Sequence, residues 1–252
     1  MDNSQATITR TFTLDKQPCL LHIPEKPNGF LVLYLGDAGH YVEEHQSFWS
    51  EHPARAELLQ SLLNRGYTLF TCHLYGNGWG SPKTTHLLQQ VFQTVKRQEI
   101  VNPFIHVVSE GMGTYTAFRW ELKYDIPIRS HIMFTPCLDL KAMYNQEQSN
   151  QLYFKKLNKE LAKAYEIEEK QTEEQVIQPA TLVSTKAPSL IFHDVQSPYY
   201  SVHEHSRRFE ENQEQQGIPV WLKLAIQPIL PRVTPSIVHF LMQQETRLDS
   251  PI

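Results

Sequence analysis

The sequence has few cysteines, no long apolar run and no marked excess of either charge. Its three cysteines, Cys19, Cys72 and Cys137, are an odd number at unrelated spacings, a pattern that indicates neither a disulfide framework nor a metal site. No run approaches the roughly 18 apolar residues of a membrane helix, and the N-terminus is too polar for a signal peptide. A net charge of −4 favours neither nucleic acid nor a membrane as partner. These absences predict a soluble, cytoplasmic protein without a cofactor.

Short apolar runs that alternate with amphipathic segments make up most of the chain. Eight segments have the pattern of strands: residues 6–14, 19–23, 30–35, 67–73, 104–108, 131–135, 188–193 and 220–226. The first two are predicted to be antiparallel edge strands, whereas continuous apolar runs indicate strands covered on both faces. Helices are expected at residues 47–64, 84–97, 114–124, 201–216 and 234–244. This alternation predicts the α/β class, with a mostly parallel eight-stranded sheet and helices on both of its faces.

Residues 141–186 differ in character from the rest of the chain. They are rich in Gln, Glu and Lys, with Phe154, Leu157, Leu161 and Tyr165 at helical spacing. We expect a helical cap inserted over the sheet, with its charged residues on solvated faces. Residues 1–252 are therefore predicted to form a single domain that carries this insertion.

The most informative stretch is residues 104–118, where a buried strand meets a glycine-containing turn and a helix. Its pentapeptide SEGMG, at residues 109–113, resembles the nucleophile elbow of α/β-hydrolases, G-x-S-x-G. Three further segments resemble that family in the same order: residues 33–40 (LYLGDAGH), 66–82 (GYTLFTCHLYGNGWGSP) and 191–209 (IFHDVQSPYYSVHEHSRRF). The resemblance implies the α/β-hydrolase fold with its cap.

The residues that this family uses for catalysis are absent at the matching positions. The resemblance places the nucleophile at Gly111 and the acid at Ser197, and the base within residues 227–232, which contain no histidine. Three simultaneous vacancies indicate a lost mechanism. Glycine also relieves the roughly 1–3 kcal/mol that the elbow conformation costs a residue with a β-carbon. The oxyanion hole would consist of the N–H groups of Met112 and Asp37, where an aspartate side chain opposes an anion unless it points away.

Other residues could still form a pocket. The candidates are Gly36, Asp37, His40, His73, Tyr75, Gly111, Met112 and Asp139. His40 and His73 end neighbouring predicted strands, with Cys72 and Tyr75 nearby, and are the best candidates for unconventional chemistry, although ordinary loop roles are commoner. Asp139 is either an acid at the end of a strand or a helix cap.

Several chemistry-bearing residues have simpler interpretations. Ser109 is expected in or near the strand rather than acting as a nucleophile, and Asp194 is expected to serve its loop. His239 is expected on a helix surface. His203 and His205 are two residues apart on a predicted helix, which disfavours a shared metal. The cysteines are expected to be inert.

Three functions are compatible with this sequence. The first is a degenerate α/β-hydrolase-like protein that binds a small apolar or acyl-type ligand, or a protein partner. The second is an active esterase, thioesterase or lyase that uses relocated groups such as His40, His73 and Asp139. The third is a subunit that assembles with an active relative. We favour the first, since all three positions of the triad are vacant.

Overall fold

The computed structural model describes residues 7–226 and 230–245. Its strands form one sheet in the order β1-β2-β4-β3-β5-β6-β7-β8. The strands are β1 (Ile8–Leu14), β2 (Gln17–Ile23), β3 (Leu31–Leu35), β4 (Thr68–Cys72), β5 (Ile105–Glu110), β6 (Ile128–Phe134), β7 (Ser189–Asp194) and β8 (Val220–Ala225). The pairs β1–β2 and β2–β4 are antiparallel and all later pairs are parallel. The predicted mostly parallel eight-stranded sheet is confirmed.

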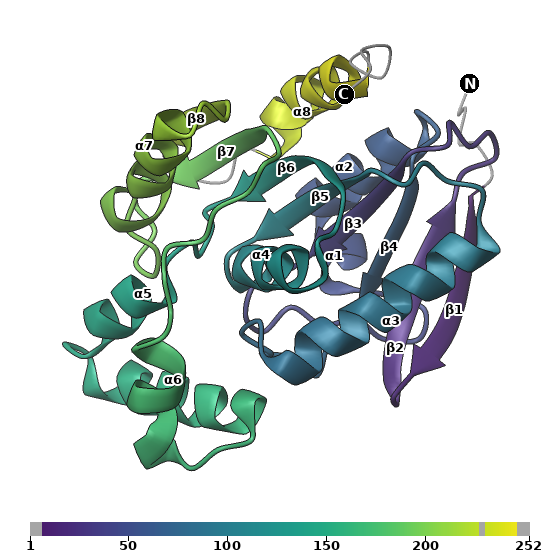
Figure 1. Cartoon of the computed structure of the whole chain (residues 1–252). Coiled ribbons are helices and arrows are strands. Elements are labelled where there is room, and N and C mark those ends of the chain that lie inside the picture. Colours follow the sequence, from purple (N-terminus) through teal and green to yellow (C-terminus); the bar gives the residue numbers. More distant parts are fainter. Residues whose placement is uncertain (1–6, 227–229, 246–252) are drawn as a thin grey trace.

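Helices cover both faces of this sheet (Figure 1). They are α1 (Phe48–Glu51), α2 (Pro53–Leu63), α3 (Pro82–Gln98), α4 (Met112–Tyr124), α5 (Leu140–Glu147), α6 (Gln151–Tyr165), α7 (Arg208–Gln215) and α8 (Leu230–Glu245), with a 3-10 turn at Glu169–Gln171 and π-helical turns at Glu173–Ile177 and His203–Arg207. Residues of α1, α2 and α8 share one apolar core with the sheet, and those of α3 and α4 share another. Among the described helices, none has both the length and the apolar character needed to cross a bilayer.

Two expectations about single elements were wrong. The helix expected at residues 47–64 is divided into α1 and α2 at His52, which has extended backbone angles (φ −81°, ψ 117°). The cause is Pro53, which lacks an N–H and disfavours the helical conformation of the residue before it. β2 is not an edge strand either, because it lies between β1 and β4.

The segment between β6 and β7 contains α5 and α6, which lie to one side of the sheet in Figure 1. We call residues 140–177 the α5–α6 segment. Leu157 and Leu161 of α6 are buried in a third apolar cluster, together with Trp79 and Met112. The helical spacing noted in the sequence therefore corresponds to the buried face of α6, and the segment packs beside the loops that follow β4 and β5.

The strand register brings two loops together at the carboxyl edge of the sheet. Leu35 of β3 pairs with Ser109 of β5, so the residues that follow these strands lie side by side. Because the chain leaves β3 towards β4 on one side and β5 lies on the other, this edge is a topological switch point, where α/β proteins form their ligand sites.

Candidate functional site

The turn between β5 and α4 keeps the shape of a nucleophile elbow but carries no nucleophile. Gly111 has φ 49° and ψ −120°, a positive-φ conformation that costs a residue with a β-carbon about 1–3 kcal/mol. Glycine adopts it without that steric cost. Gly113 is also needed, since a β-carbon there would lie 2.5 Å from the carbonyl oxygen of Gly36. The local sequence thus preserves the turn and its close packing against the loop after β3.

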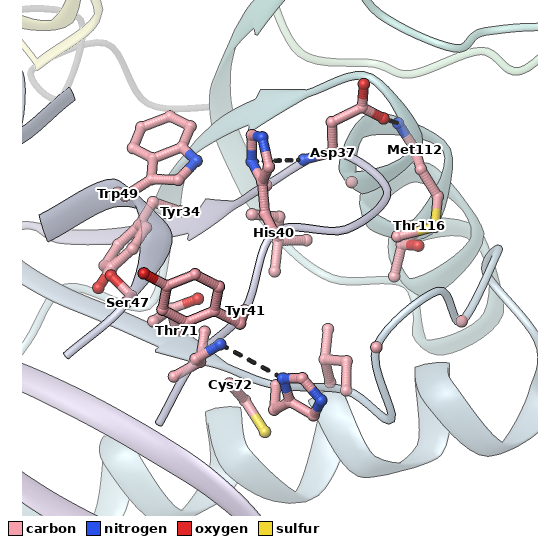
Figure 2. Close-up of a pocket in the computed structure, with 18 of the residues that line it drawn as sticks. Tyr34, Asp37, His40, Tyr41, Ser47, Trp49, Thr71, Cys72, Met112 and Thr116 are labelled. Atoms are coloured by element: carbon pink, nitrogen blue, oxygen red, sulfur yellow. Dashed lines mark hydrogen bonds between the residues drawn. The ribbon is translucent and has the colours of Figure 1, made fainter. Parts of the chain in front are cut away.

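The side chain of Asp37 occupies the space in front of this elbow (Figure 2). Its Oδ1 atom accepts hydrogen bonds from the N–H groups of Met112 and Ala38, both at 2.7 Å, and from the hydroxyl of Tyr200 at 2.9 Å. A β-carbon built on Gly111 would lie only 2.0 Å from both Cγ and Oδ1 of Asp37. The carboxylate therefore takes the place of a nucleophile side chain, and its oxygen accepts the Met112 N–H that an oxyanion would need.

Neither N–H group of the expected oxyanion hole points to an open site. Met112 N–H donates to Asp37, and Asp37 N–H donates to Nδ1 of His40 at 3.0 Å. The sequence left the direction of the Asp37 side chain open; in the structure it points into the hole.

Burial raises the pKa of Asp37 above its ordinary value, whereas the Met112 and Ala38 amides, the Tyr200 hydroxyl and the Arg55 charge oppose the rise. Arg55 is held nearby by its ion pair with Glu110, with Nε 2.8 Å from Oε2. Burial, and then the charge of Asp37, raise the pKa of Tyr200 well above its ordinary value. Tyr200 accordingly stays protonated and acts as a donor to the carboxylate.

Tyr200 is itself fixed by the loop after β7. Its N–H donates to Oγ of Ser197 at 3.3 Å, and its carbonyl oxygen accepts from Nε2 of His193 at 2.9 Å. Nδ1 of His193 accepts from the hydroxyl of Ser206 at 2.6 Å. Ser197, at the position of the missing acid, thus orients the tyrosine that contacts Asp37. Tyr200 was not predicted from the sequence; the only available signal was the adjacent tyrosine pair that follows a strand.

His40 and His73 both line a small cavity with Gly36 and Cys72. Its volume is about 30 Å³, which leaves room for little more than a water molecule. Nδ1 of His73 accepts the N–H of Val42 at 3.3 Å. Burial lowers the pKa of His73, and burial followed by the Arg55 charge lowers that of His40 to about 3. Both rings are neutral acceptors that organise their loops.

The two remaining pocket candidates lie outside this small cavity, and Tyr75 lines a wider groove of about 560 Å³ with His73. The hydroxyl of Tyr75 donates to Asp15 in the turn between β1 and β2. Asp139 is the N-cap of α5, with Oδ1 accepting from Ala142 N–H at 2.9 Å, and its Oδ2 pairs with Arg208 at 3.0 Å. These contacts fit a helix cap for Asp139 and an ordinary loop role for Tyr75.

The other candidate residues from the sequence have contacts that fit a structural role. Ser109 is fully buried in β5, 2.9 Å from the Thr114 hydroxyl, and His239 is exposed on α8 beside Gln243. Nδ1 of His205 accepts the N–H of Leu138 at 3.1 Å.

The base was expected within residues 227–232, of which 227–229 lie outside the described residues and 230–232 begin α8. The three cysteines are buried and unpaired by disulfides, and burial raises the pKa of Cys137 well above its ordinary value. Over the described ranges, no group of three His, Cys, Asp or Glu residues could hold a metal ion.

A larger cleft opens on the other side of Asp37, between the sheet edge and the α5–α6 segment. Its volume is about 220 Å³, more than the roughly 150 Å³ of an engineered cavity that binds benzene. It is lined by Asp37, Ala38, Gly39, Asn77, Trp79, Met143, Glu147, Tyr153, Lys156, Leu157, Glu160, Tyr199 and Tyr200. No histidine is among these described lining residues, so the cleft combines aromatic rings and carboxylates without a base of the usual type.

In sequence, no model of a known protein family matches the chain, and no curated protein matches it. In structure, Est1E from Butyrivibrio proteoclasticus matches with a TM-score of 0.64 and 14% identity, over 94% of this chain and 99% of that one. The esterase Pf2001 of Pyrococcus furiosus matches with a TM-score of 0.63 and 14% identity, over 95% and 93%.

The uncomplexed acylaminoacyl peptidase of Pyrococcus horikoshii gives a TM-score of 0.72 at 11% identity, over 99% of this chain. The chain spans 44% of that protein's length. At these identities the likeness concerns the fold. The strand order, the elbow turn and these structural neighbours together show that the chain has the α/β-hydrolase fold.

Proposed function

We propose that this protein is a catalytically inactive member of the α/β-hydrolase fold that binds a small ligand in the cleft beneath the α5–α6 segment, which serves as its cap. One observation carries the proposal: the Asp37 carboxylate fills the space in front of Gly111 and accepts the Met112 N–H.

Acyl transfer in this fold requires an attacking group and donors for the oxyanion that forms. Gly111 supplies no attacking group. A carboxylate oxygen 2.7 Å from the Met112 nitrogen leaves that donor with an acceptor already in place. A second negative charge at the same position would also be repelled by the first.

Chemistry by relocated groups has less support. His40 faces a cavity of about 30 Å³, too small for an ester substrate, whereas His73 also lines a wider groove of about 560 Å³. In both rings Nδ1 already accepts a backbone N–H. Asp139 caps α5 and contacts Arg208 rather than a histidine of that cavity. These three residues thus have structural roles that do not require catalysis.

The esterases and the peptidase with this fold do not transfer their activity to the chain, because one fold supports many functions. Binding of a protein partner, and assembly with an active relative, stay predictions from the sequence. The cleft gives a specific reason to favour a small ligand, since it combines a volume of about 220 Å³ with aromatic and charged walls.

Hydrolysis of a panel of short- and medium-chain p-nitrophenyl esters tests the proposal. We expect no turnover above background from the wild type or from the His40→Ala and His73→Ala variants. The exposed His239→Ala is the matched control for loss of a histidine. Turnover by the wild type that His40→Ala or His73→Ala abolishes, while His239→Ala keeps it, would overturn the proposal in favour of relocated catalysis.

A further inference from the structure

Glu147 is a largely buried residue in the wall of the cleft, and its carboxylate has no counter-charge among the described residues. Only 8% of the residue is exposed, and its side chain lines the cavity. Within the described part of the chain, no hydrogen-bond donor or cation contacts this carboxylate. Burial raises the pKa of Glu147. Partial desolvation of this unpaired carboxylate disfavours its charged form, a cost that a cationic ligand in the cleft would relieve.

The position of Glu147 in its helix adds to this cost. It is the last residue of α5, where the backbone carbonyls give the helix end a partial negative charge. A cation is favoured at such an end and an anion is disfavoured. The helix end and the carboxylate therefore both select a positively charged group.

The remaining charges of the cleft do not neutralise Glu147. Asp37 is satisfied by its three donors, and Glu160 accepts from Nε1 of Trp79 at 3.3 Å. Lys156, the cation among the lining residues, lies 3.9 Å from Glu160 and its side chain is 72% exposed. The cleft thus contains three carboxylates and one ammonium group. Asp37 and Glu160 have partners within the protein, and Glu147 has none in the part of the chain that the structure describes.

Aromatic rings form much of the remaining wall. Trp79 is almost fully buried, and Tyr153 and Tyr199 are about half exposed. The Tyr153 and Tyr199 rings are 6.4 Å apart, and the Tyr199 and Tyr200 rings 6.5 Å apart. Aromatic faces attract ammonium groups, more strongly where water is excluded.

We propose that the cleft binds a small organic cation of the ammonium type, with Glu147 as its counter-ion and the tyrosine rings around its alkyl groups. This inference rests on the proposed function, because it names the ligand class of the same cleft. It differs from the apolar or acyl-type ligand expected from the sequence, which stays a prediction. An anionic ligand is disfavoured because it would meet three negative side chains.

Isothermal titration calorimetry with four probes of similar size tests the charge requirement. Choline is a quaternary cation, 3,3-dimethylbutan-1-ol is its neutral isostere, butylamine is a protonated primary amine, and butyrate is an anion. We expect choline, butylamine or both to bind, with choline alone indicating that the rings dominate. Neither the neutral isostere nor butyrate should bind comparably. The inference would be overturned if the neutral isostere and butyrate bound at least as tightly as the cations. It would also be overturned if neither choline nor butylamine bound.

Glu147→Gln tests the assigned counter-ion at nearly constant shape. We expect it to weaken cation binding about tenfold, whereas Glu174→Gln, an equal change of charge at an exposed residue of the α5–α6 segment, leaves binding unchanged. Glu147→Gln should also raise the melting temperature, since it removes a partly desolvated negative charge from the C-terminal end of a helix. Equal binding by the two variants would contradict the role of Glu147.

Failure of this inference and failure of the proposed function give different results. A protein that turns over no ester and binds neither cation contradicts only the assignment of an organic cation as the ligand. A protein that turns over esters contradicts the proposed function, whatever it binds.

Discussion

Asp37 and Gly111 form a complementary pair at the centre of the site. The carboxylate lies where the side chain of residue 111 would be, and the absence of a β-carbon at Gly111 leaves room for it. Neither residue alone explains the arrangement, because an aspartate could turn away and a glycine could leave the hole empty. The hydrogen bonds from Met112, Ala38 and Tyr200 hold the carboxylate in place.

This pairing predicts a steric coupling between the two positions. Gly111→Ala combines a positive φ with a contact of 2.0 Å to the Asp37 carboxyl group, and we expect it to lower the free energy of unfolding by about 3 kcal/mol. In an Asp37→Ala background the same change should cost only about 1 kcal/mol, the backbone strain alone. Urea denaturation of the two single variants and the double variant measures the coupling.

Gly39→Ala is the matched control for that cycle. Gly39 has a φ of 84°, but a β-carbon there would meet nothing within 4 Å. Its substitution should therefore cost about 1 kcal/mol with or without Asp37. Equal costs for Gly111→Ala and Gly39→Ala in the wild-type background would contradict the placement of the carboxylate.

At this scale the sequence predicted part of the site. The positions of Gly111, Met112 and Asp37 were implied by the resemblance of two strand ends to those of α/β-hydrolases. The direction of the Asp37 side chain was not, because it depends on Tyr200, 163 positions further along the chain. The negative charge of the cleft was also not predicted from the sequence. Glu147 lies within a segment rich in charged residues, and only the packing of that segment shows that this residue is largely buried.

At the scale of elements, the pattern of apolar residues in the sequence predicted the strands better than local signals predicted the helix ends. Each of the eight strands was predicted close to its observed bounds. Continuous apolar runs are typical of strands covered on both faces, as in β3 and β4, whereas the outer strand β1 is largely exposed. The division between α1 and α2 follows from Pro53, which disfavours the helical conformation of His52. The interior place of β2 could not be seen locally, since it depends on which strand pairs with its second edge.

The role of Asp139 is a testable point at this scale. Asp139→Ala removes the N-cap of α5 and should lower the free energy of unfolding by about 1 kcal/mol. Asp139→Asn keeps an oxygen for the Ala142 N–H and loses only the pair with Arg208, whose side chain is 43% exposed. We expect Asn at this position to be nearly neutral. Equal losses for the two variants in thermal denaturation would contradict the capping role.

At the scale of the whole molecule, buried neutral histidines predict sensitivity to acid. Burial lowers the pKa of His22 and of His205 from 6.5 to about 4. Since the folded-state pKa is the lower one, the unfolded state binds more protons between these values. The stability that each histidine contributes is present above pH 6.5 and is lost as the pH falls towards about 4.

We therefore expect the free energy of unfolding to fall less steeply over this range in His22→Gln than in the wild type. Carboxyl groups whose pKa is raised, such as Asp37 and Glu110, act in the opposite direction, but they are common to both proteins and cancel in the comparison. Urea denaturation at several pH values measures the slopes, with the exposed His45→Gln as control. Equal slopes for His22→Gln and the wild type would contradict the prediction.

The state of the Met112 amide in solution decides whether the oxyanion hole is closed. Nuclear magnetic resonance can follow the proton exchange and chemical shift of this N–H in the wild type and in Asp37→Ala. We predict slow exchange and a downfield shift in the wild type, because the N–H donates to the Asp37 carboxylate, and the loss of both in the variant. Fast exchange in the wild type, or no response to Asp37→Ala, would mean that the hole is open and would contradict the inactive state proposed for this protein.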